Sequence, residues 1–218
     1  MATKTETMKT DILSAYTQHA LEHEVFPTSV YKFCKENSID ETEFYNTYAS
    51  LDSVKHAVWQ AFYDNASALL AKNEHFDSLS RKDRLLTFFY TFFEVLLLNR
   101  SYVLFALHEN AQPMKNLGQM KQLRKAVKAF AAELIEEGND DKTLSLAKHP
   151  VGLFSEAAWS QLLFILKFWL DDTSPAFEKT DAAIEKSITV AFDVFDNTQL
   201  EALVDLGKFL WKEKISKN

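Results

Sequence analysis

The composition of this 218-residue chain excludes several classes of protein. Hydrophobic residues make up 47% of it, which suffices for a sizeable core, and the length allows one or two domains. Only 4 Gly and 4 Pro occur, so we expect long helices with few connections instead of a strand-and-turn architecture. The net charge of -7 argues against general attraction to nucleic acid, although it leaves room for a small basic patch.

The sequence indicates a soluble protein of a reducing compartment. The single cysteine, Cys34, cannot form an internal disulfide. The first ten residues are polar and lack the apolar segment of a secretory signal. The longest apolar run, Leu85 to Leu98, is too short to cross a bilayer. We therefore expect a cytoplasmic protein.

Apolar residues recur at helical spacing along the first 72 residues. Ile12, Leu13, Tyr16 and Ala20 share one face of a first helix that ends before Pro27. Thr28 or Ser29 can cap a second helix that ends near residue 37. Residues 38–40 predict a tight turn, 41–48 a third short helix, and 51–72 a longer helix.

Longer helices are expected in the rest of the chain. Ser80 and Asp83 form a plausible capping box for a helix over 81–99. Further helices are expected near 101–111, 116–137, 149–171, 177–195 and 199–215. The composition changes near residue 75, which separates a small head from a larger, Phe-rich body. The prediction is an all-α protein with about 9–10 helices.

A known helix-turn-helix pattern emerges over residues 12–54. The residues at matching spacing are Phe26, Thr28-Ser29-Val30, Phe33-Cys34, Ser38-Ile39-Asp40 and Phe44-Tyr45-Asn46-Thr47-Tyr48. This register resembles the head of the TetR family of ligand-sensing regulators. The resemblance implies a three-helix head at 1–54, joined by a helix at 51–72 to a ligand-binding and dimerisation domain at 73–218. It also implies operator DNA and a second copy of the chain as partners.

The presumed DNA-reading segment departs from the family pattern. Four positions differ from the residue that is usual in the family: Asp40 replaces Ser, Thr42 replaces Gly, Thr47 replaces His and Leu51 replaces Lys. Five acidic residues and no Lys or Arg occur from Glu36 to Asp52, so repulsion replaces attraction to phosphate. The candidate DNA-binding residues are Lys32, Lys35, Thr42, Tyr45, Asn46, Thr47, Tyr48 and Lys55. Either these residues read an unusual operator, or the head is kept only for folding.

The body carries two helices that are apolar on nearly all sides, at 85–98 and 154–169, and such helices are surrounded by protein. The resemblance implies a small hydrophobic ligand between the central helices. The candidate pocket residues are Phe88, Phe89, Phe92, Phe93, Arg100, His108, Glu156, Trp159 and Phe164. A fatty or isoprenoid chain would suit such walls. Alternatively, the aromatic residues simply fill the core.

The resemblance also places a homodimer interface on helices 149–171 and 177–195. Its candidate residues are Trp159, Leu163, Leu166, Phe192 and Phe195.

The segment 199–215 has one apolar face and a polar face of mixed charge. We expect it to dock on the body, because mixed charge disfavours binding to a membrane surface.

Signals for catalysis are weak. His19, Glu22 and His23 match the spacing of an inverted zinc-peptidase motif, but the sequence indicates no third ligand. The four glycines are isolated, so no phosphate-binding loop is expected. We therefore expect no enzyme, metal or cofactor.

The favoured function is a ligand-responsive regulator with weak or altered DNA recognition. The alternatives are a lipid or isoprenoid carrier that does not bind DNA and a protein that binds a partner through its acidic head.

Overall fold

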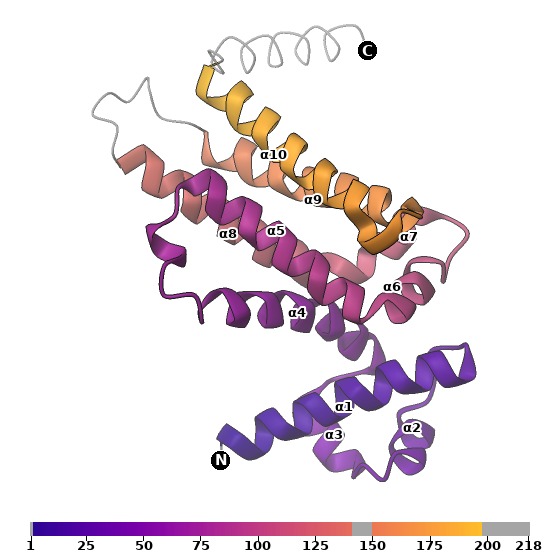
Figure 1. Ribbon diagram of the computed structural model, residues 1–218. Coiled ribbons are helices and arrows are strands. Elements are labelled where there is room, and N and C mark those ends of the chain that lie inside the picture. Colours follow the sequence, from indigo (N-terminus) through magenta and orange to yellow (C-terminus); the bar gives the residue numbers. More distant parts are fainter. Residues whose placement is uncertain (1, 141–149, 198–218) are drawn as a thin grey trace, which may run out of the picture. The chain divides into compact units, whose positions relative to one another are not determined.

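The computed structural model describes residues 2–140 and 150–197, and every regular element in these ranges is a helix (Figure 1). This confirms the predicted all-α class. Contacts group the chain into two compact units. Unit 1 comprises residues 1–76 and 90–128, and unit 2 comprises residues 77–89 and 129–218. The predicted division into a head at 1–54 and a body at 73–218 stays a prediction, as does the helix at 199–215, which lies outside the described residues.

Unit 1 begins with a helix-turn-helix. Its elements are α1 (Ala2–His23), α2 (Val30–Glu36), α3 (Glu41–Thr47), α4 (Leu51–Leu70), the end of α5 (Arg81–Leu98), α6 (Arg100–Leu107), α7 (Pro113–Asn116), a 3-10 helix (Leu117–Met120) and the start of α8 (Lys121–Asp140). The helix expected over 101–111 is shorter than predicted. Its Leu107 carbonyl accepts a hydrogen bond from Asn116 Nδ2 at 2.6 Å, which ends the helix.

Side-chain caps explain where the short helices begin. Ser29 Oγ accepts a hydrogen bond from the Lys32 amide, which decides between the two predicted caps in favour of Ser29. Asp40 Oδ1 accepts from the Glu43 amide at 3.0 Å and starts α3. Ser50 and Ser53 bond each other's amides at the start of α4. These local contacts are why the sequence predicted the boundaries well.

The core of the head is aromatic. Ile12, Tyr16 and Ala20 are buried, as their spacing predicted. The Tyr16 ring meets the Phe33 ring edge-on at 6.3 Å between centroids, and Phe33 meets Phe44 at 6.1 Å. This stack joins α1 to both helices of the helix-turn-helix, so the head has a packed interior of its own.

Unit 2 is built on α9 (Val151–Asp171) and α10 (Glu178–Asn197), with the start of α5 and the end of α8. The turn between α9 and α10 is organised by Asp172. Its carboxylate accepts hydrogen bonds from the amide and hydroxyl of both Ser174 and Thr180 at 2.6–2.9 Å. These bonds, with the Ser174 hydroxyl contributing most, hold the pKa of Asp172 well below its usual range.

One described helix, α9, has the length and hydropathy of a membrane span, and α5 with α6 passes the same test across an 88° bend. Leu162 and Ile165 of α9 are fully buried, and Trp169 is nearly so. Packing inside unit 2 therefore accounts for part of the apolar character of α9, whose apolar window is 39% buried.

Candidate DNA-reading face and its supporting network

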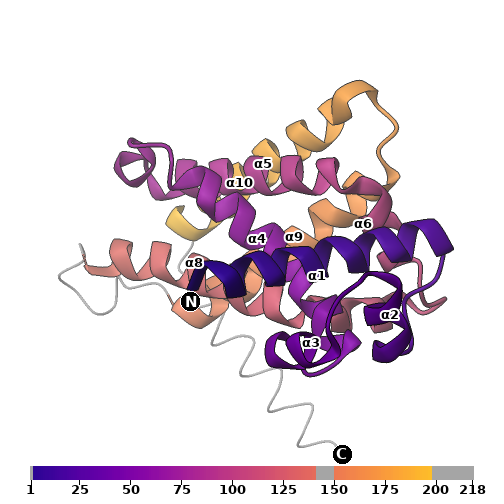
Figure 2. The same cartoon turned by 90° about the horizontal axis from the view of Figure 1, so that it is seen from below.

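The candidate site is the exposed face of α2 and α3 in unit 1 (Figure 2). On α3, Phe44 is fully buried, whereas Thr42, Tyr45 and Asn46 are exposed. An amide, a phenol and a hydroxyl can donate and accept hydrogen bonds at base edges, and Asn pairs well with adenine. The face therefore carries groups able to read sequence.

The positively charged candidates differ in how far their side chains are exposed. Lys32 and Lys35 are exposed on α2, where they are able to meet phosphate. Lys55 is only 14% exposed, since its Nζ lies 2.7 Å from Glu109 Oε1 and 3.8 Å from the centroid of the Phe26 ring. Its ammonium group is thus held inside unit 1.

The remaining two candidates are less exposed, Thr47 being half-buried and Tyr48 buried. The Thr47 hydroxyl donates to the Glu43 carbonyl at 2.9 Å, which satisfies it within α3. Tyr48 is 7% exposed, and burial raises its pKa to about 12. Their role in DNA binding stays a prediction, but the structure makes both residues part of the support of α3.

Several acidic residues of the head have structural roles. Asp40 caps α3, and Glu41 and Glu43 lie in its first turn, where negative charge interacts favourably with the helix dipole. Glu36 Oε2 lies 3.6 Å from His19 Nδ1, and Asp52 Oδ2 lies 3.3 Å from His56 Nε2. Folding therefore benefits from these residues, although they repel phosphate.

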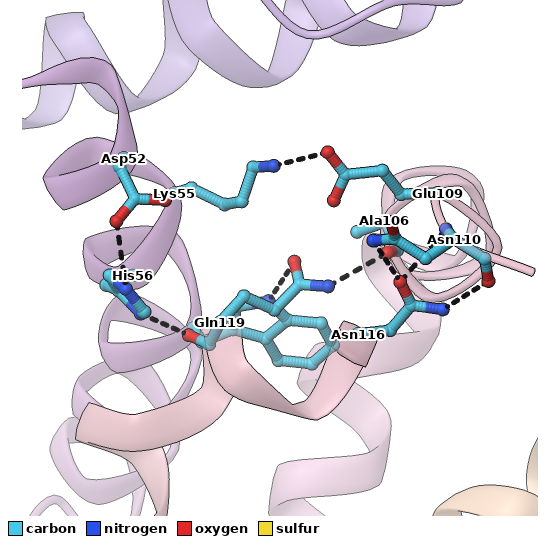
Figure 3. A network of polar contacts seen from close by, with 9 residues as sticks. Asp52, Lys55, His56, Ala106, Glu109, Asn110, Asn116 and Gln119 are labelled. Atoms are coloured by element: carbon cyan, nitrogen blue, oxygen red, sulfur yellow. Dashed lines mark hydrogen bonds and ion pairs between the residues drawn. The ribbon is translucent and has the colours of Figure 1, made fainter. Parts of the chain in front are cut away.

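A polar network ties α4 to the chain that follows α6 (Figure 3). Gln119, which is 6% exposed, accepts from Trp59 Nε1 at 2.9 Å and donates to the Ala106 carbonyl at 2.8 Å. The Gln119 carbonyl lies 2.8 Å from His56 Nδ1. Asn116 and Asn110 extend the network with further side-chain bonds. Sequence analysis missed this cluster, because its residues are about 60 positions apart.

Buried phenols lie in the same unit. Burial raises the pKa of Tyr16 and of Tyr102 above the usual range, and nearby Glu109 adds to both shifts. Within the described part of the chain, the hydroxyls of Tyr48 and Tyr102 find no hydrogen-bond partner. Tyr48 also lines a hollow of about 530 Å³ between α1 and α4, with Ser14 and Ala57 among the residues on its walls.

The candidate pocket residues are spread over both units. In unit 1, Phe92 and Phe93 are buried, Arg100 is half-buried, and His108 is exposed with Nδ1 2.7 Å from the Leu104 carbonyl. In unit 2, Phe88, Phe89 and Trp159 are buried, Glu156 is half-buried, and Phe164 is 58% exposed.

A small hollow lies among Leu85, Ile135, Phe154 and Phe192 of unit 2. Its volume of about 30 Å³ is far below that of a typical ligand cleft, which is about 300–1,000 Å³. Most of the aromatic residues therefore fill the core in this conformation, and a hydrophobic ligand pocket stays a prediction.

The candidate dimer residues also lie mainly in the core. Trp159, Leu166 and Phe192 are buried within their own chain, Leu163 is half-buried, and the side chain of Phe195 lies outside the described part. Sequence reasoning did not assign to the interface the exposed apolar side chains of these helices, which are Leu153, Phe164 and Phe168 on α9 and Val190 and Val194 on α10. The i, i+4 spacing of Phe164 with Phe168 and of Val190 with Val194 was the signal that could have identified these pairs.

The His19 and His23 rings lie close together, with centroids 4.4 Å apart. No group of three or more His, Cys, Asp or Glu that could hold a metal ion occurs among the residues that the structure describes.

Comparison with known proteins identifies the family. Residues 84–210, more than half of the chain, match the family model described as "Tetracyclin repressor-like, C-terminal domain". A search of curated proteins found no match. The fold and the α2–α3 unit are those of a helix-turn-helix regulator with a C-terminal ligand-binding domain. The chain belongs to the TetR family of transcriptional regulators.

Solved structures share this fold. A TetR-family regulator from Syntrophomonas wolfei has a TM-score of 0.66 at 13% identity, with 85% of this chain and 95% of that chain covered. One from Shewanella sp. PV-4 has a TM-score of 0.52 at 18% identity, covering 87% and 96%. A TerR/AcrR-family regulator from Aquifex aeolicus VF5 has a TM-score of 0.51 at 16% identity, covering 84% and 99%.

Proposed function

We propose that this chain is a cytoplasmic, homodimeric, ligand-responsive regulator that binds operator DNA weakly and with altered sequence recognition. The observation that carries the proposal is the exposed face of the head. It presents Thr42, Tyr45 and Asn46 beside Lys32 and Lys35, while Lys55 is held by Glu109. Base-reading groups are therefore present, whereas few cations are available for phosphate.

The balance of charge explains why binding would be weak. Each neutralised phosphate releases counterions and strengthens binding at low salt. Lys32 and Lys35 can contribute two such contacts, and Glu36, Glu41 and Asp52 oppose them. Discrimination between sequences would then depend mainly on the hydrogen bonds of α3.

Ligand response would depend on opening of the aromatic core. Unit 2 contains a hollow of about 30 Å³, so an apolar ligand would have to separate α9 and α10 from their neighbours. A ligand that favours the opened conformation would shift the population of heads able to bind DNA.

A second candidate is a hydrophobic-ligand carrier that does not bind DNA. The acidic residues from Glu36 to Asp52 and the sequestered Lys55 favour it. In that case the head would serve only as a folded scaffold, and exposed Tyr45 and Asn46 would have no partner in DNA.

Fluorescence anisotropy with the DNA upstream of the protein's own gene separates the two candidates. We expect Asn46→Ala to weaken specific binding about tenfold, because a bidentate base contact is worth about 1–3 kcal/mol. Lys32→Ala should reduce the slope of log affinity against log salt by about two, because each head of a dimer loses one phosphate contact. Asn65→Ala, on the exposed side of α4, is the matched control and should have no effect. Equal affinity for all three variants and the wild type would contradict the regulator.

A further inference from the structure

The first half of α8 carries a concentrated basic face. Lys121, Arg124, Lys125 and Lys128 stand at i, i+3, i+4 and i+7, so they share one side of the helix. Residues 110–132 contain five Lys or Arg and no Asp or Glu, although the whole chain has a net charge of -7. Positive charge is therefore locally concentrated in this stretch, with no acidic residue inside it.

The basic face borders a hollow. A cavity of about 580 Å³ is lined by His56 of α4 and by Lys121, Gln122, Arg124, Lys125 and Lys128 of α8. His56 is fixed in place by Asp52 at 3.3 Å and by the Gln119 carbonyl at 2.8 Å. The volume lies in the range of small-molecule sites, so the row of cations borders a hollow that is open to solvent and large enough for a small molecule.

The order of charges along α8 opposes its own dipole. Negative charge is favoured at a helix N-terminus and positive charge at its C-terminus. In α8 the first turn has no acidic residue and the cations follow directly, whereas Glu133, Glu136 and Glu137 lie towards the end. The cations at i, i+3 and i+4 also repel one another. A bound anion would reduce both costs.

We infer that this face binds a compact polyanion with two or more linked phosphate groups. Lys121 and Lys128 are seven residues apart, which is about 10 Å along a helix and longer than a single phosphate. A concave wall of one helix and one histidine fits a short chain of phosphates better than the convex surface of a duplex. The inference does not depend on whether the head binds DNA.

Isothermal titration of the full chain with inorganic tripolyphosphate, at constant ionic strength, tests the inference. We expect saturable binding at one site per chain, a rise in melting temperature, and weaker binding of single inorganic phosphate. The double variant Lys121→Glu, Lys125→Glu should bind at least about tenfold more weakly, because two attractive contacts become repulsive. The control is a second double variant on α10, Lys179→Glu, Lys186→Glu. It changes two exposed residues and the net charge by the same amount, and it should bind tripolyphosphate like the wild type.

Three outcomes would overturn the inference. Tripolyphosphate binding without saturation would exclude a site, and equal losses in both double variants would show only a general charge effect. If tripolyphosphate fails to saturate and the α8 double variant also binds a DNA duplex more weakly than the wild type does, the face is a nucleic-acid contact. Circular dichroism checks that each variant folds. The milder Lys121→Gln, Lys125→Gln variant serves if the charge reversal does not fold, and it too should weaken binding.

Discussion

At the scale of single residues, Lys55 has two partners from different parts of unit 1. Glu109, which follows α6, lies 2.7 Å from its ammonium group, and the Phe26 ring lies beneath it. The position of Lys55 next to the head predicted a role in DNA binding. The contact that draws it inward could not be predicted, because Glu109 lies 54 residues later in the chain. By contrast, the exposure of Lys32, Lys35 and Asn46 followed from local helical spacing.

Replacing Glu109 by Gln should release Lys55. We expect DNA affinity at physiological salt to rise about threefold or more, because one further cation becomes available for phosphate. Glu74→Gln removes an exposed negative charge elsewhere in unit 1 and is the matched control. Fluorescence anisotropy measures both, and an equal gain in the two variants would show that the Lys55 contact is irrelevant.

Gln119 is the residue on which the buried network depends. Gln119→Leu would leave Trp59 Nε1 and the Ala106 carbonyl without their bonds in a buried site. We expect the free energy of unfolding to fall by about 1–3 kcal/mol. Urea denaturation measures this loss, with exposed Gln122→Leu as the control. A loss below about 0.5 kcal/mol, the usual limit for surface substitutions, would mean that water replaces these bonds.

At the scale of elements, caps and turns decide where helices begin and end. Ser29, Asp40 and Ser50 accept hydrogen bonds from amides within three residues, so their effects are visible in the sequence. The turn at Asp172 also uses nearby partners, Ser174 and Thr180. The predicted helices at 149–171 and 177–195 implied a break between them but not the role of the carboxylate, because the pattern of turn residues does not show which side chain accepts the bonds.

The Asp172 turn makes stability depend on pH. Its folded-state pKa lies below the ordinary value of 3.8, so the unfolded chain takes up a proton first as the pH falls. The stabilisation is complete above that value and is lost as the pH falls towards the folded-state pKa. We expect the free energy of unfolding of Asp172→Asn to depend less steeply on pH between about 5 and 3 than that of the wild type.

Chemical denaturation at several pH values measures this difference. Asp171→Asn removes the exposed carboxylate next to Asp172 in the chain, which pairs with Lys167, and serves as the control. Parallel pH profiles for the wild type and Asp172→Asn would contradict the role given to the carboxylate.

At the scale of the whole molecule, the low content of Gly and Pro and the helical spacing were enough to predict the all-α class. They could not show which apolar residues fill the core and which remain exposed, since both kinds lie on the same apolar helices. Trp159 and Leu166 turned out to be buried, whereas Phe164 and Phe168 are exposed. The exposed residues are therefore better candidates for contact with a second copy than the predicted ones.

Phe164→Glu should disrupt a homodimer formed through α9. Light scattering after size exclusion is expected to show a dimer for the wild type and a monomer at low micromolar concentration for the variant, because the charge would be buried without a partner. Leu98→Glu changes a residue that is 85% exposed on α5 and should remain dimeric. A dimeric Phe164→Glu protein would place the interface elsewhere.

The central claim is that a folded helix-turn-helix still recognises DNA with few phosphate contacts. The most direct test is a salt titration of wild-type binding to the upstream duplex and to an unrelated duplex. We predict preference for the upstream duplex and a shallow dependence on salt, with a slope of about -4, because two contacts from each head of a dimer make four. Absence of binding even at low salt would contradict the claim and leave the head as a scaffold.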